Sequence, residues 1–563
     1  MIKKEIICLI LVITLLSCST VSAATYTVND NMNNDFIQMM IGFMSPGDVL
    51  NFLDGIYTDI HLIVNKAINI TANTGGVLFQ STNYNNNLTG LTINSNDVNI
   101  SNINFDNYLT GISVNNSNNT KITNTTYTNT DTGISVNSSN NTGITNTKGS
   151  EKITVDNSNN TKITNTEDSR KISVNSSNNT EINNTKGAER ISVDNSRNTE
   201  ITNTKDSGEI SVDKSKNTKI TNTKNAQKIS VNSSNNTEIT NTDFTTSWYG
   251  NVISVDRSNN TKITNTEIGY GVKQDVISIS NSNNTTIVNT SFSNMFVTMG
   301  ISIYNSSETY ITNTQGFNSD FEWYIIGIFD SKGTHIADTY NNATHHDYSI
   351  FIYDSNDNYI TNTIINSIWG GGIYIHNGIN NYITNTAINS NLIAGISISG
   401  DNNYIINSTL HNGGIFISGV NNYISNALIS TYGDGISIYG GVNSSISNVT
   451  INRIPYDYDD DWSYYYSNGI NLYDSVNTTI NSATINNFGQ GISFNGNCSN
   501  AIISNSTITN SNYGILVSPG NQHIRIVSNL LANNFIGILI QQAYNVTMSS
   551  NTYYNNEEDI VIE

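Results

Sequence analysis

A short apolar motif recurs along almost the whole chain. The motif consists of isoleucine, any residue, and then valine or isoleucine. Its copies begin at residues from Ile112 to Ile538, at intervals of about 19 to 25 residues with one interval of 34. About ten residues after each copy comes a second motif, Ile-Thr-Asn-Thr or a variant, first at Ile122. Repeats of this length are typical of solenoids, in which each repeat packs only on its neighbours.

Each motif alternates apolar and polar residues, is rich in β-branched side chains and is bounded by Asn, Ser or Gly, which is typical of a strand. The segments between motifs lack the length and the periodicity of a helix. The repeat therefore predicts an all-β fold, a single-stranded parallel β-helix solenoid of about twenty coils with two or three short strands per coil.

Asparagine recurs at one register of the second motif. By strict alternation Asn124 shares the inward side with Ile122, so we expect a ladder of inward amides that hydrogen-bond from coil to coil. We interpret this use of asparagine as structural rather than catalytic. The clearest members are Asn124, Asn146, Asn165, Asn203, Asn222, Asn241, Asn265, Asn289 and Asn313.

The N-terminus has the features of an export signal. Lys3 and Lys4 precede the apolar run 6–16, and small residues at 21–24 offer a cleavage site. A lipoprotein signal with Cys18 as the lipidated residue is the alternative. No later run is long enough to span a bilayer, so we expect a secreted or cell-surface protein without a transmembrane segment in the mature chain.

Changes in repeat length divide the chain further. The segment 31–44 has the spacing of a short amphipathic helix that caps the first coil. The predicted organisation is a signal peptide at 1–24, an N-terminal cap and first coils at 25–99, a regular short-coil β-helix at 100–242, a longer-coil β-helix with variable aromatic loops at 243–552, and an acidic C-terminal cap at 553–563.

Composition excludes two classes of protein. With 24 Lys and Arg against 44 Asp and Glu, the formal net charge is −20, whereas a nucleic-acid-binding surface has to be basic. Apolar residues make up 36% of the chain and 30 residues are Tyr, which is not the profile of a disordered chain.

The sequence resembles the adhesin-like surface proteins of methanogenic archaea, which belong to the right-handed, pectin-lyase-like β-helix repeat proteins. The residues that carry the resemblance are Gly-Asp-Val-Leu-Asn-Phe-Leu-Asp-Gly-Ile-Tyr at 47–57, Ile-Val-Asn-Lys-Ala-Ile-Asn-Ile at 63–70 and the serial repeats that follow. The resemblance implies a right-handed helix, a surface or secreted location and a role in attachment.

Aromatic residues gather in the variable segments of the second half. Aromatic rings beside acids or amides suit the binding of sugars, so surface glycans or polysaccharide are the expected partners. Packing within the loops and a third strand is the alternative use of these rings. The candidate ligand-binding residues are Trp248, Trp323, Tyr324, Trp369, Tyr456 and Trp462.

Catalytic and metal-binding signals are weak. The residues that point outward from the first motif, from Ser113 through Phe351, Tyr374 and Phe416, are uncharged, so no catalytic residue is identified. No cofactor is expected except Ca²⁺, whose preference for carboxylate oxygens fits the acidic loop around 457–461. A solvated acidic loop is the alternative. The candidate calcium ligands are Asp457, Asp459, Asp460 and Asp461.

The main functional hypothesis is an exported adhesin-like protein that mediates attachment or binds glycans without catalysis. The first alternative is a polysaccharide lyase or glycoside hydrolase of the pectin-lyase-like β-helix class. The second alternative is a structural component of the cell envelope. Sequons such as the one at Asn118 are glycan acceptors in an exported chain, although an Asn- and Ser-rich sequence also produces them by chance.

Overall fold

The protein is an all-β parallel β-helix of about 22 turns, which confirms the fold class predicted from the repeat. The computed structural model describes residues 22–83, 87–244, 251–269, 275–293, 296–345, 348–367, 370–390, 394–455 and 466–563. The chain divides into two compact units, Met1–Ser207 (unit 1) and Gly208–Glu563 (unit 2).

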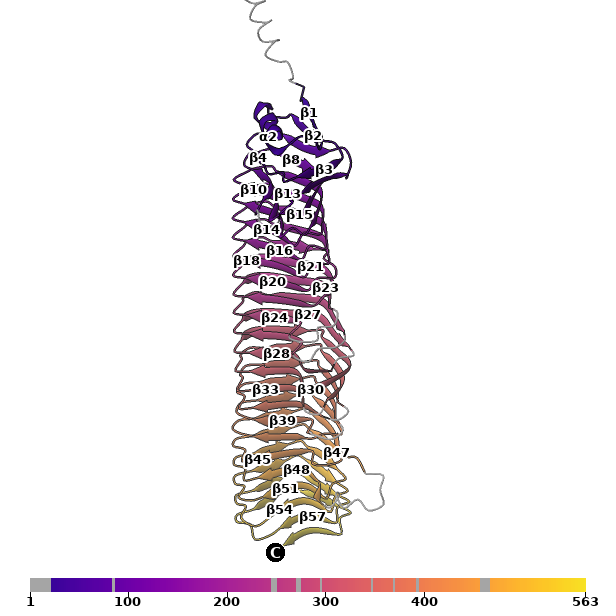
Figure 1. Ribbon diagram of the computed structural model, residues 1–563. Coiled ribbons are helices and arrows are strands. Elements are labelled where there is room, and N and C mark those ends of the chain that lie inside the picture. The colour runs from indigo at the N-terminus through magenta and orange to yellow at the C-terminus, as the bar shows by residue number, and fades with distance from the viewer. Residues whose placement is uncertain are drawn as a thin grey trace, which may run out of the picture. The chain divides into compact units, whose positions relative to one another are not determined.

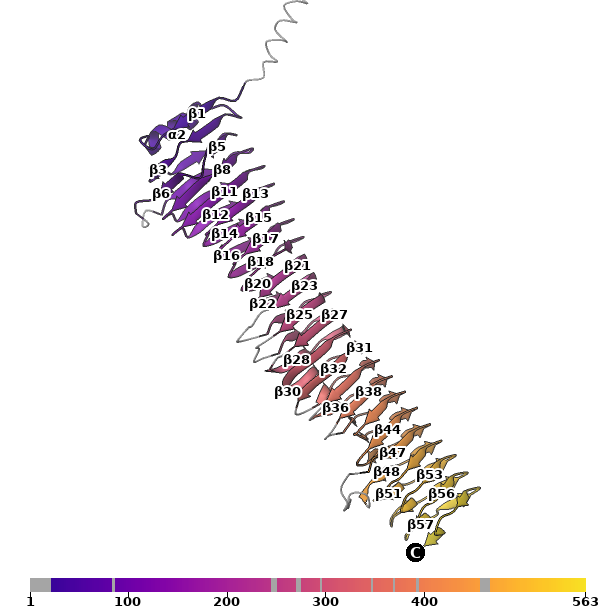
Figure 2. The ribbon, with the colours of Figure 1, turned by 90° about the vertical axis from the view of Figure 1, so that its right-hand side faces the viewer.

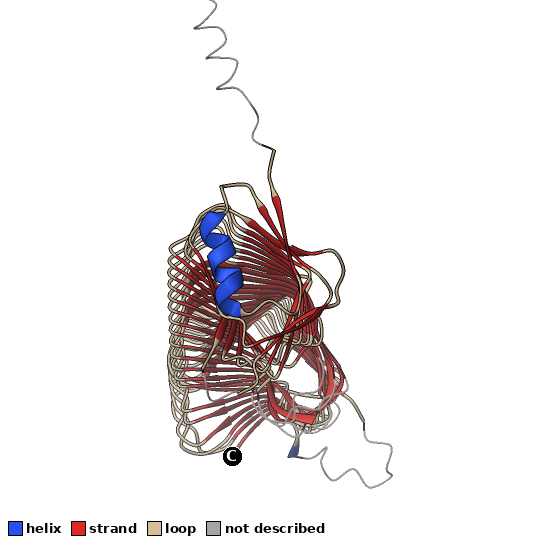
Figure 3. Ribbon diagram, turned by 45° about the horizontal axis from the view of Figure 1, so that its top comes forward, coloured by secondary structure: helices blue, strands red, loops and turns tan. Residues whose placement is uncertain are grey.

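The predicted capping helix is present in unit 1 as α2 (Asn34–Phe43). It lies across the end of the first coils (Figure 3) and buries Ile37 and Ile41. The Asn33 side chain accepts a hydrogen bond from the amide of Phe36 at 3.0 Å, and Lys66 Nζ donates to the carbonyl of Gly42 at 2.6 Å. Both ends of the helix thus find partners for groups that the helix itself leaves unpaired.

The strands of unit 1 lie on three faces and pair in parallel from coil to coil (Figure 1). Strand β11 (Lys121–Thr128) covers the second face and continues onto the third. The first face consists of β4 (Leu62–Val64), β7 (Thr89–Ile93), β10 (Thr110–Asn115), β12 (Thr132–Asn137), β14 (Lys152–Asp156), β16 (Lys171–Asn175) and β18 (Arg190–Asp194). The second consists of β1 (Thr25–Val28), β2 (Val49–Phe52), β5 (Asn69–Ala72), β8 (Asn99–Ser101), β11 (Lys121–Thr128), β13 (Gly143–Lys148), β15 (Lys162–Glu167), β17 (Glu181–Lys186) and β19 (Glu200–Thr202). The third begins with β3 (Gly55–Thr58), β6 (Val77–Gln80) and β9 (Ile103–Asp106).

Unit 2 repeats the three faces within itself (Figure 2). Its first face consists of β20 (Glu209–Asp213), β22 (Lys228–Asn232), β24 (Ile253–Asp256), β26 (Ile277–Ser280), β28 (Phe296–Tyr304), the end of β30, β33 (Tyr348–Tyr353), β36 (Gly371–His376), β39 (Ile396–Ser399), β42 (Ile415–Ser418), β45 (Ile436–Tyr439), β48 (Asn468–Tyr473), β51 (Gln490–Asn495), β54 (Tyr513–Val517), β57 (Ile536–Ile540) and β60 (Glu558–Ile562).

The other two faces of unit 2 carry mostly shorter strands. The second face consists of β21 (Lys216–Ala226), β23 (Asn235–Phe244), β25 (Lys262–Gly269), β27 (Asn283–Ser293), β29 (Ser307–Thr312), β31 (His335–Ala337), β34 (Tyr359–Thr361), β37 (Tyr382–Thr384), β40 (Tyr404–Ile406), β43 (Tyr423–Ser425), β46 (Ser445–Ser447), β49 (Thr479–Asn481), β52 (Ile502–Ser504), β55 (Arg525–Val527) and β58 (Thr547–Ser549). The third consists of β30 (Gln315–Phe329), which continues onto the first face, β32 (Tyr340–His345), β35 (Ile364–Ser367), β38 (Ala387–Ser390), β41 (Thr409–His411), β44 (Leu428–Thr431), β47 (Thr450–Arg453), β50 (Thr484–Asn486), β53 (Thr507–Thr509), β56 (Leu530–Ala532) and β59 (Thr552–Tyr554).

The interior of each unit is built from columns of identical or similar residues. Ile112 pairs with Ile134 and Val114 with Val136, and all four are fully buried. A second inward column holds serine at the corner after the first face. There the Ser158 amide donates to Ser177 Oγ at 3.1 Å, and the Ser177 hydroxyl donates to the Asn175 carbonyl at 2.8 Å. Aliphatic burial is thus shared coil by coil, and the corner groups are paired across coils.

The expected inward orientation of the asparagine ladder is wrong. Asn124 is exposed, with φ 53°, and the residue buried beside Ile122 is Thr125. A left-handed residue turns the chain at a corner, so the strict alternation of a strand does not continue through it. Asparagine tolerates this conformation better than other residues with a β-carbon. The same correction applies to Asn146, Asn165, Asn203, Asn222, Asn241, Asn265, Asn289 and Asn313, which are all exposed with positive φ.

The amides nevertheless hydrogen-bond from coil to coil on the outside. Asn124 Nδ2 donates to Asn102 Oδ1 at 2.9 Å, and Asn146 Nδ2 donates to Asn124 Oδ1 at 2.8 Å. In unit 2 the Asn265 amide donates to Asn241 at 3.0 Å. Asn203 departs from the pattern, because its amide donates to Asn183 instead of Asn184.

The C-terminal residues form the last coil of unit 2. Strand β60 pairs with β57, and Ile562 of β60 is 68% exposed. In the part of the chain that the structure describes, no helix has the length and apolar character needed to cross a bilayer.

Candidate functional site

Aromatic side chains gather on the outer side of the first face of unit 2. They come from four successive coils, β28, β30, β33 and β36, whose parallel register places equivalent residues above one another. We call this group the face-1 aromatic cluster. Its members are Tyr304, Tyr324, Phe329, Tyr348, Phe351, Tyr353, Tyr374 and His376.

The rings of the cluster form one connected surface. Tyr324 stacks on Phe351 with ring centroids 4.2 Å apart and planes within 10°, and Phe351 stacks on Tyr374 at 5.3 Å. Tyr353 stacks on His376 at 5.0 Å. Tyr353 is 39% exposed and the other members are half-buried, so the cluster lies at the surface.

A glycine makes room for the rings. Gly327 occupies the outward position that Phe351 holds in the next coil. A β-carbon at Gly327 would come within 2.7 Å of the Phe329 ring and 2.9 Å of Met299 Sδ. Because real β-carbons do not approach other atoms so closely, a larger residue here would displace the Phe329 ring.

A carboxyl group lies at the edge of the cluster. This carboxyl group belongs to Asp275, which precedes β26, and its charge acts on the Tyr304 hydroxyl. Burial raises the pKa of the Asp275 carboxyl. Burial, together with the charge of Asp275, raises the pKa of Tyr304 to about 12. Among the carboxyl groups that the structure describes, Asp275 is the one whose pKa is raised.

A second row of rings follows the second face of unit 2. Neighbouring centroids in this row are 4.6 to 6.2 Å apart, and most of the ring planes lie within 12° of each other. Each ring therefore covers the face of the next one and presents mainly its edge to solvent. The row consists of Tyr310, His335, Tyr359, Tyr382, Tyr404 and Tyr423.

Farther along the first face, the outward residues become polar. Asp434 accepts hydrogen bonds from the Asn468 amide at 2.8 Å and from the Ser437 hydroxyl at 3.0 Å. The Ser493 hydroxyl donates to Asn468 Oδ1 at 2.7 Å. Ser437 and Ser493 are fully buried, so this polar group is a closed network rather than an open surface.

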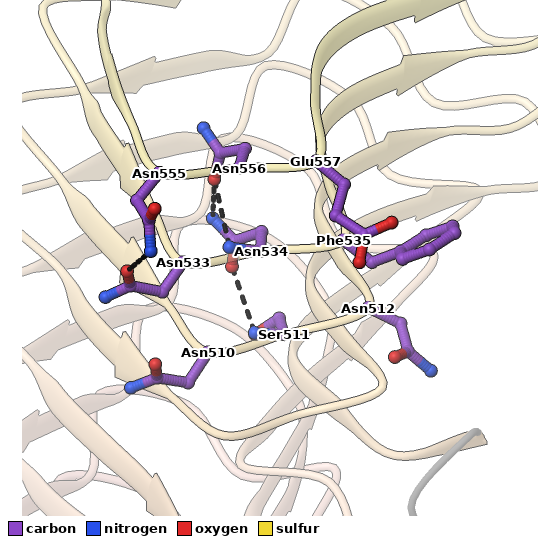
Figure 4. Close-up of a pocket in the computed structure, with 9 residues that line it drawn as sticks. All are labelled: Asn510, Ser511, Asn512, Asn533, Asn534, Phe535, Asn555, Asn556 and Glu557. Atoms are coloured by element: carbon purple, nitrogen blue, oxygen red, sulfur yellow. Dashed lines mark hydrogen bonds between the residues drawn. The ribbon is translucent and has the colours of Figure 1, made fainter.

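A hollow of about 570 Å³ lies near the C-terminal end of unit 2 (Figure 4). Most of its lining is asparagine that is already paired within the coils. The Ser511 amide donates to Asn534 Oδ1 at 3.0 Å, and Asn555 Nδ2 donates to Asn533 Oδ1 at 2.8 Å. The lining of this hollow is therefore explained by the pairing of the coils.

Only one of the predicted ligand-binding residues has a described side chain. Tyr324 belongs to the face-1 aromatic cluster. Trp248, Trp369, Tyr456 and Trp462 lie outside the described residues, as does the side chain of Trp323.

The predicted calcium ligands are also not described. Asp457, Asp459, Asp460 and Asp461 lie outside the described residues, so calcium binding there stays a prediction. Within the described segments, no group of three or more His, Cys, Asp or Glu side chains could hold a metal ion.

Sequence reasoning missed the rings on the strand itself. Phe351 and Tyr374 are recognisable as outward residues of the repeat, but the search for a site tested that column only for charge. The signal that could have found the cluster is the replacement of serine by aromatic residues at the same repeat position in successive coils.

Comparison with known proteins gives a family match over part of the chain. Residues 434–563 match the family described as a right-handed β-helix region. Among curated proteins, none matches the sequence.

Solved structures with a similar fold include three proteins named for polysaccharides or their cleavage. A family PL6 alginate lyase in complex with a trisaccharide is 11% identical, with a TM-score of 0.26, covering 97% of this chain and 89% of the lyase. The A-module of the mannuronan C-5 epimerase AlgE6 from Azotobacter vinelandii is 9% identical, with a TM-score of 0.20, covering 90% of this chain and 91% of the module. The catalytic domain of a GH87 α-1,3-glucanase is 12% identical, with a TM-score of 0.19, covering 81% of this chain and 69% of the domain.

These findings contradict the expected non-catalytic adhesin, because the solved structures bear the names of lyases, epimerases and a glucanase. At such low identity the likeness itself extends to the fold alone, so the activity has to be argued from the residues of this chain.

Proposed function

We propose that the protein is an enzyme that cleaves a polysaccharide bound along the first face of unit 2. The observation that carries this proposal is the face-1 aromatic cluster with the half-buried Asp275 at its edge. Sugar rings have apolar C–H surfaces that pack on aromatic side chains, and their hydroxyl groups bond to phenols and carboxyl groups. The cluster extends over four coils, so it offers contacts to several sugars of one chain.

Asp275 is the proposed proton donor to the glycosidic oxygen. A general acid has to keep its proton near the working pH, and burial raises the pKa of Asp275 in that direction. A protonated carboxyl at the edge of a sugar-binding surface can donate to the leaving oxygen of a chain that lies across the rings. The cleavage is completed either by attack of a water molecule or by elimination, and the chemical structure of the product distinguishes the two.

The test is an assay on a panel of alginate, polygalacturonate and neutral glucans. New reducing ends report any cleavage, and absorbance of an unsaturated product identifies elimination. Asp275→Asn is expected to lower kcat by about 100-fold or more with little change in KM, since positioned general acids contribute roughly that much. The rate of the unsubstituted enzyme is expected to fall as pH rises through the pKa of Asp275.

Asp330→Asn is the matched control, because Asp330 is an exposed carboxylate at a corner of the same unit. It is expected to keep full activity. Cleavage that is unchanged in Asp275→Asn would remove this residue from the mechanism. Absence of cleavage and binding across the whole panel would overturn the proposed function.

Two expectations from the N-terminus and the acidic loop remain proposals. Export is supported by the basic and apolar residues before residue 24, and it would bring the enzyme to polymers outside the cell. Calcium binding by the loop at 457–461 is supported only by its carboxylates.

A further inference from the structure

The aromatic column of the first face is interrupted after Tyr374. The outward residues of β33, β36, β39 and β42 are paired in register as Phe351, Tyr374, Ser397 and Phe416. The neighbouring outward column reads His376, Ser399 and Ser418 over the last three of these coils. Ser397 and Ser399 of β39 thus follow the rings of β36, and the next coil again has a ring, Phe416, in the first of the two columns.

The interruption has the height of one ring. Phe351 and Tyr374, which are one coil apart, have centroids 5.3 Å from each other. Strands in a sheet are about 4.8 Å apart, so Tyr374 and Phe416, two coils apart, are separated by about twice that spacing. Aromatic stacking needs about 4.5 Å or somewhat more on each side, so one further ring fits between them.

Serine does not fill this space. The Ser397 side chain ends at its hydroxyl oxygen, one atom beyond the β-carbon, and Ser399 is equally short. Ser397, Tyr374 and Phe416 are all half-buried, so none of the three is sealed inside the protein. The surface that borders the interruption has aromatic rings on both sides and two hydroxyl groups at its floor.

We infer that one neutral pyranose ring of the bound polysaccharide inserts between Tyr374 and Phe416, above Ser397. This inference rests on the proposed function and adds a named subsite and a sugar class to it. A pyranose whose hydroxyl groups are equatorial presents C–H bonds on both of its faces, which matches two aromatic walls. Its hydroxyl groups then point toward the rim and the floor, where Ser397 and Ser399 bond to them.

Charge selects the sugar class. The five residues around the interruption are Tyr374, His376, Ser397, Ser399 and Phe416, and none of them is Lys, Arg, Asp or Glu. A uronate would place its carboxylate at this site without a cation to pair with it, which is unfavourable. The subsite therefore fits a glucose-like residue better than a uronic acid.

The test places an aromatic side chain of the protein in the interruption. Ser397→Phe completes the column of rings, and stacking between successive coils should keep the fold intact. Titration calorimetry with a β-1,4-linked glucose hexamer is expected to show an affinity at least about tenfold lower than that of the unsubstituted protein, equivalent to the loss of a good stacking contact. Ser254→Phe, an outward serine on β24 of the same face, is the matched control and should bind the hexamer normally.

A second variant protects the test against misfolding. Phe416→Ala removes one wall without adding bulk, and it is also expected to weaken binding of the glucose hexamer. A hexamer of mannuronate serves as the charged probe and should bind more weakly to the unsubstituted protein.

The outcomes separate the two proposals. If the protein cleaves a polysaccharide but Ser397→Phe and Phe416→Ala bind the glucose hexamer normally, the subsite is wrong and the proposed function stands. If the mannuronate hexamer binds more tightly and both variants lose it, the sugar class is wrong. If no polymer or hexamer binds, the proposed function and the subsite both fail.

Discussion

Asn146 Nδ2 donates to Asn124 Oδ1 at 2.8 Å, and both residues hold a left-handed backbone with φ of 54° and 53°. Asn146 also accepts a hydrogen bond from Asn165 Nδ2 at 3.0 Å. One residue type therefore meets two requirements at this corner. Its backbone turns the chain outside the usual region for L-residues, and its amide ties the coil to the coils before and after it.

Replacing Asn146 by alanine should therefore destabilise its coil for two separate reasons. The left-handed conformation costs about 1–2 kcal/mol for a residue such as alanine, and loss of the ladder bonds costs about 1 kcal/mol more. Asn146→Gly keeps the left-handed conformation accessible, so it should lose only the stabilisation from the ladder hydrogen bonds. Hydrogen exchange of the β13 amides, followed by mass spectrometry, measures both. Equal exchange in the two variants would show that the backbone term is absent.

The repeat was sufficient to predict the β-helix, because Ile122 and its equivalents can bury their side chains only by stacking on neighbouring coils. The orientation of Asn124 was not predictable from alternation. Alternation holds only while the backbone stays extended, and the corner residue leaves that region. Knowledge that Asn favours positive φ would have placed Thr125, rather than Asn124, in the core.

The candidate site was predictable only in part. Tyr324 was identified as an aromatic residue in a variable segment, but its partner Phe351 lies in the next coil. The register between β28 and β30 shifts between Val297 and Met299, so β30 has one extra residue before Tyr324. Repeat spacing does not reveal a bulge of this kind, because the bulge changes the pairing inside a strand.

The inward serine column should be sensitive to loss of its hydroxyl groups. Ser177 Oγ accepts from the Ser158 amide and donates to the Asn175 carbonyl in the interior. Ser177→Ala leaves the buried Ser158 amide without its acceptor, which should cost about 1–3 kcal/mol. Hydrogen exchange of the β14 and β16 amides should accelerate accordingly. Ser173→Ala, a half-buried outward residue of β16, should change exchange little. Similar acceleration in both variants would contradict this account.

Cys498 occupies a position that serine holds in the preceding coil. Its thiol is fully buried and accepts from the Ser475 amide at 3.4 Å, and burial raises the pKa of this thiol. We therefore expect Cys498 to resist alkylation by iodoacetamide in the folded protein at pH 8 and to react after denaturation. Mass spectrometry of the peptide that contains Cys498 measures this. Rapid labelling of the native protein would contradict the burial.

Replacement of Cys498 separates its packing from its polarity. Cys498→Ser should change the free energy of unfolding by no more than about 1 kcal/mol, because a hydroxyl oxygen accepts the hydrogen bond from the Ser475 amide as well as the sulfur does. Cys498→Val fills the space but leaves that buried amide unpaired, so it should destabilise the coil by about 1–3 kcal/mol. Exchange of the amides of β48 and β51 distinguishes the two variants. Equal stability of both would show that the amide does not depend on the sulfur.

Asp256 should make one part of unit 2 sensitive to acid. Burial raises its pKa, but hydrogen bonds from Asn281 at 2.9 Å, Ser280 at 2.8 Å and Arg257 at 2.8 Å outweigh burial, so the pKa lies below its ordinary value. A carboxyl group with a lowered folded-state pKa stabilises the protein above its unfolded-state pKa, about 3.9, and this stabilisation is lost as pH falls through the folded value. Relative to Asp256→Asn, the unsubstituted protein should therefore protect the β24 and β26 amides better at pH 6 and lose that advantage below about pH 4. Hydrogen exchange corrected for intrinsic rates measures the difference, with the exposed Asp330→Asn as control. An advantage that persists at the lowest pH would show that the hydrogen bonds do not depend on the charge of the carboxylate.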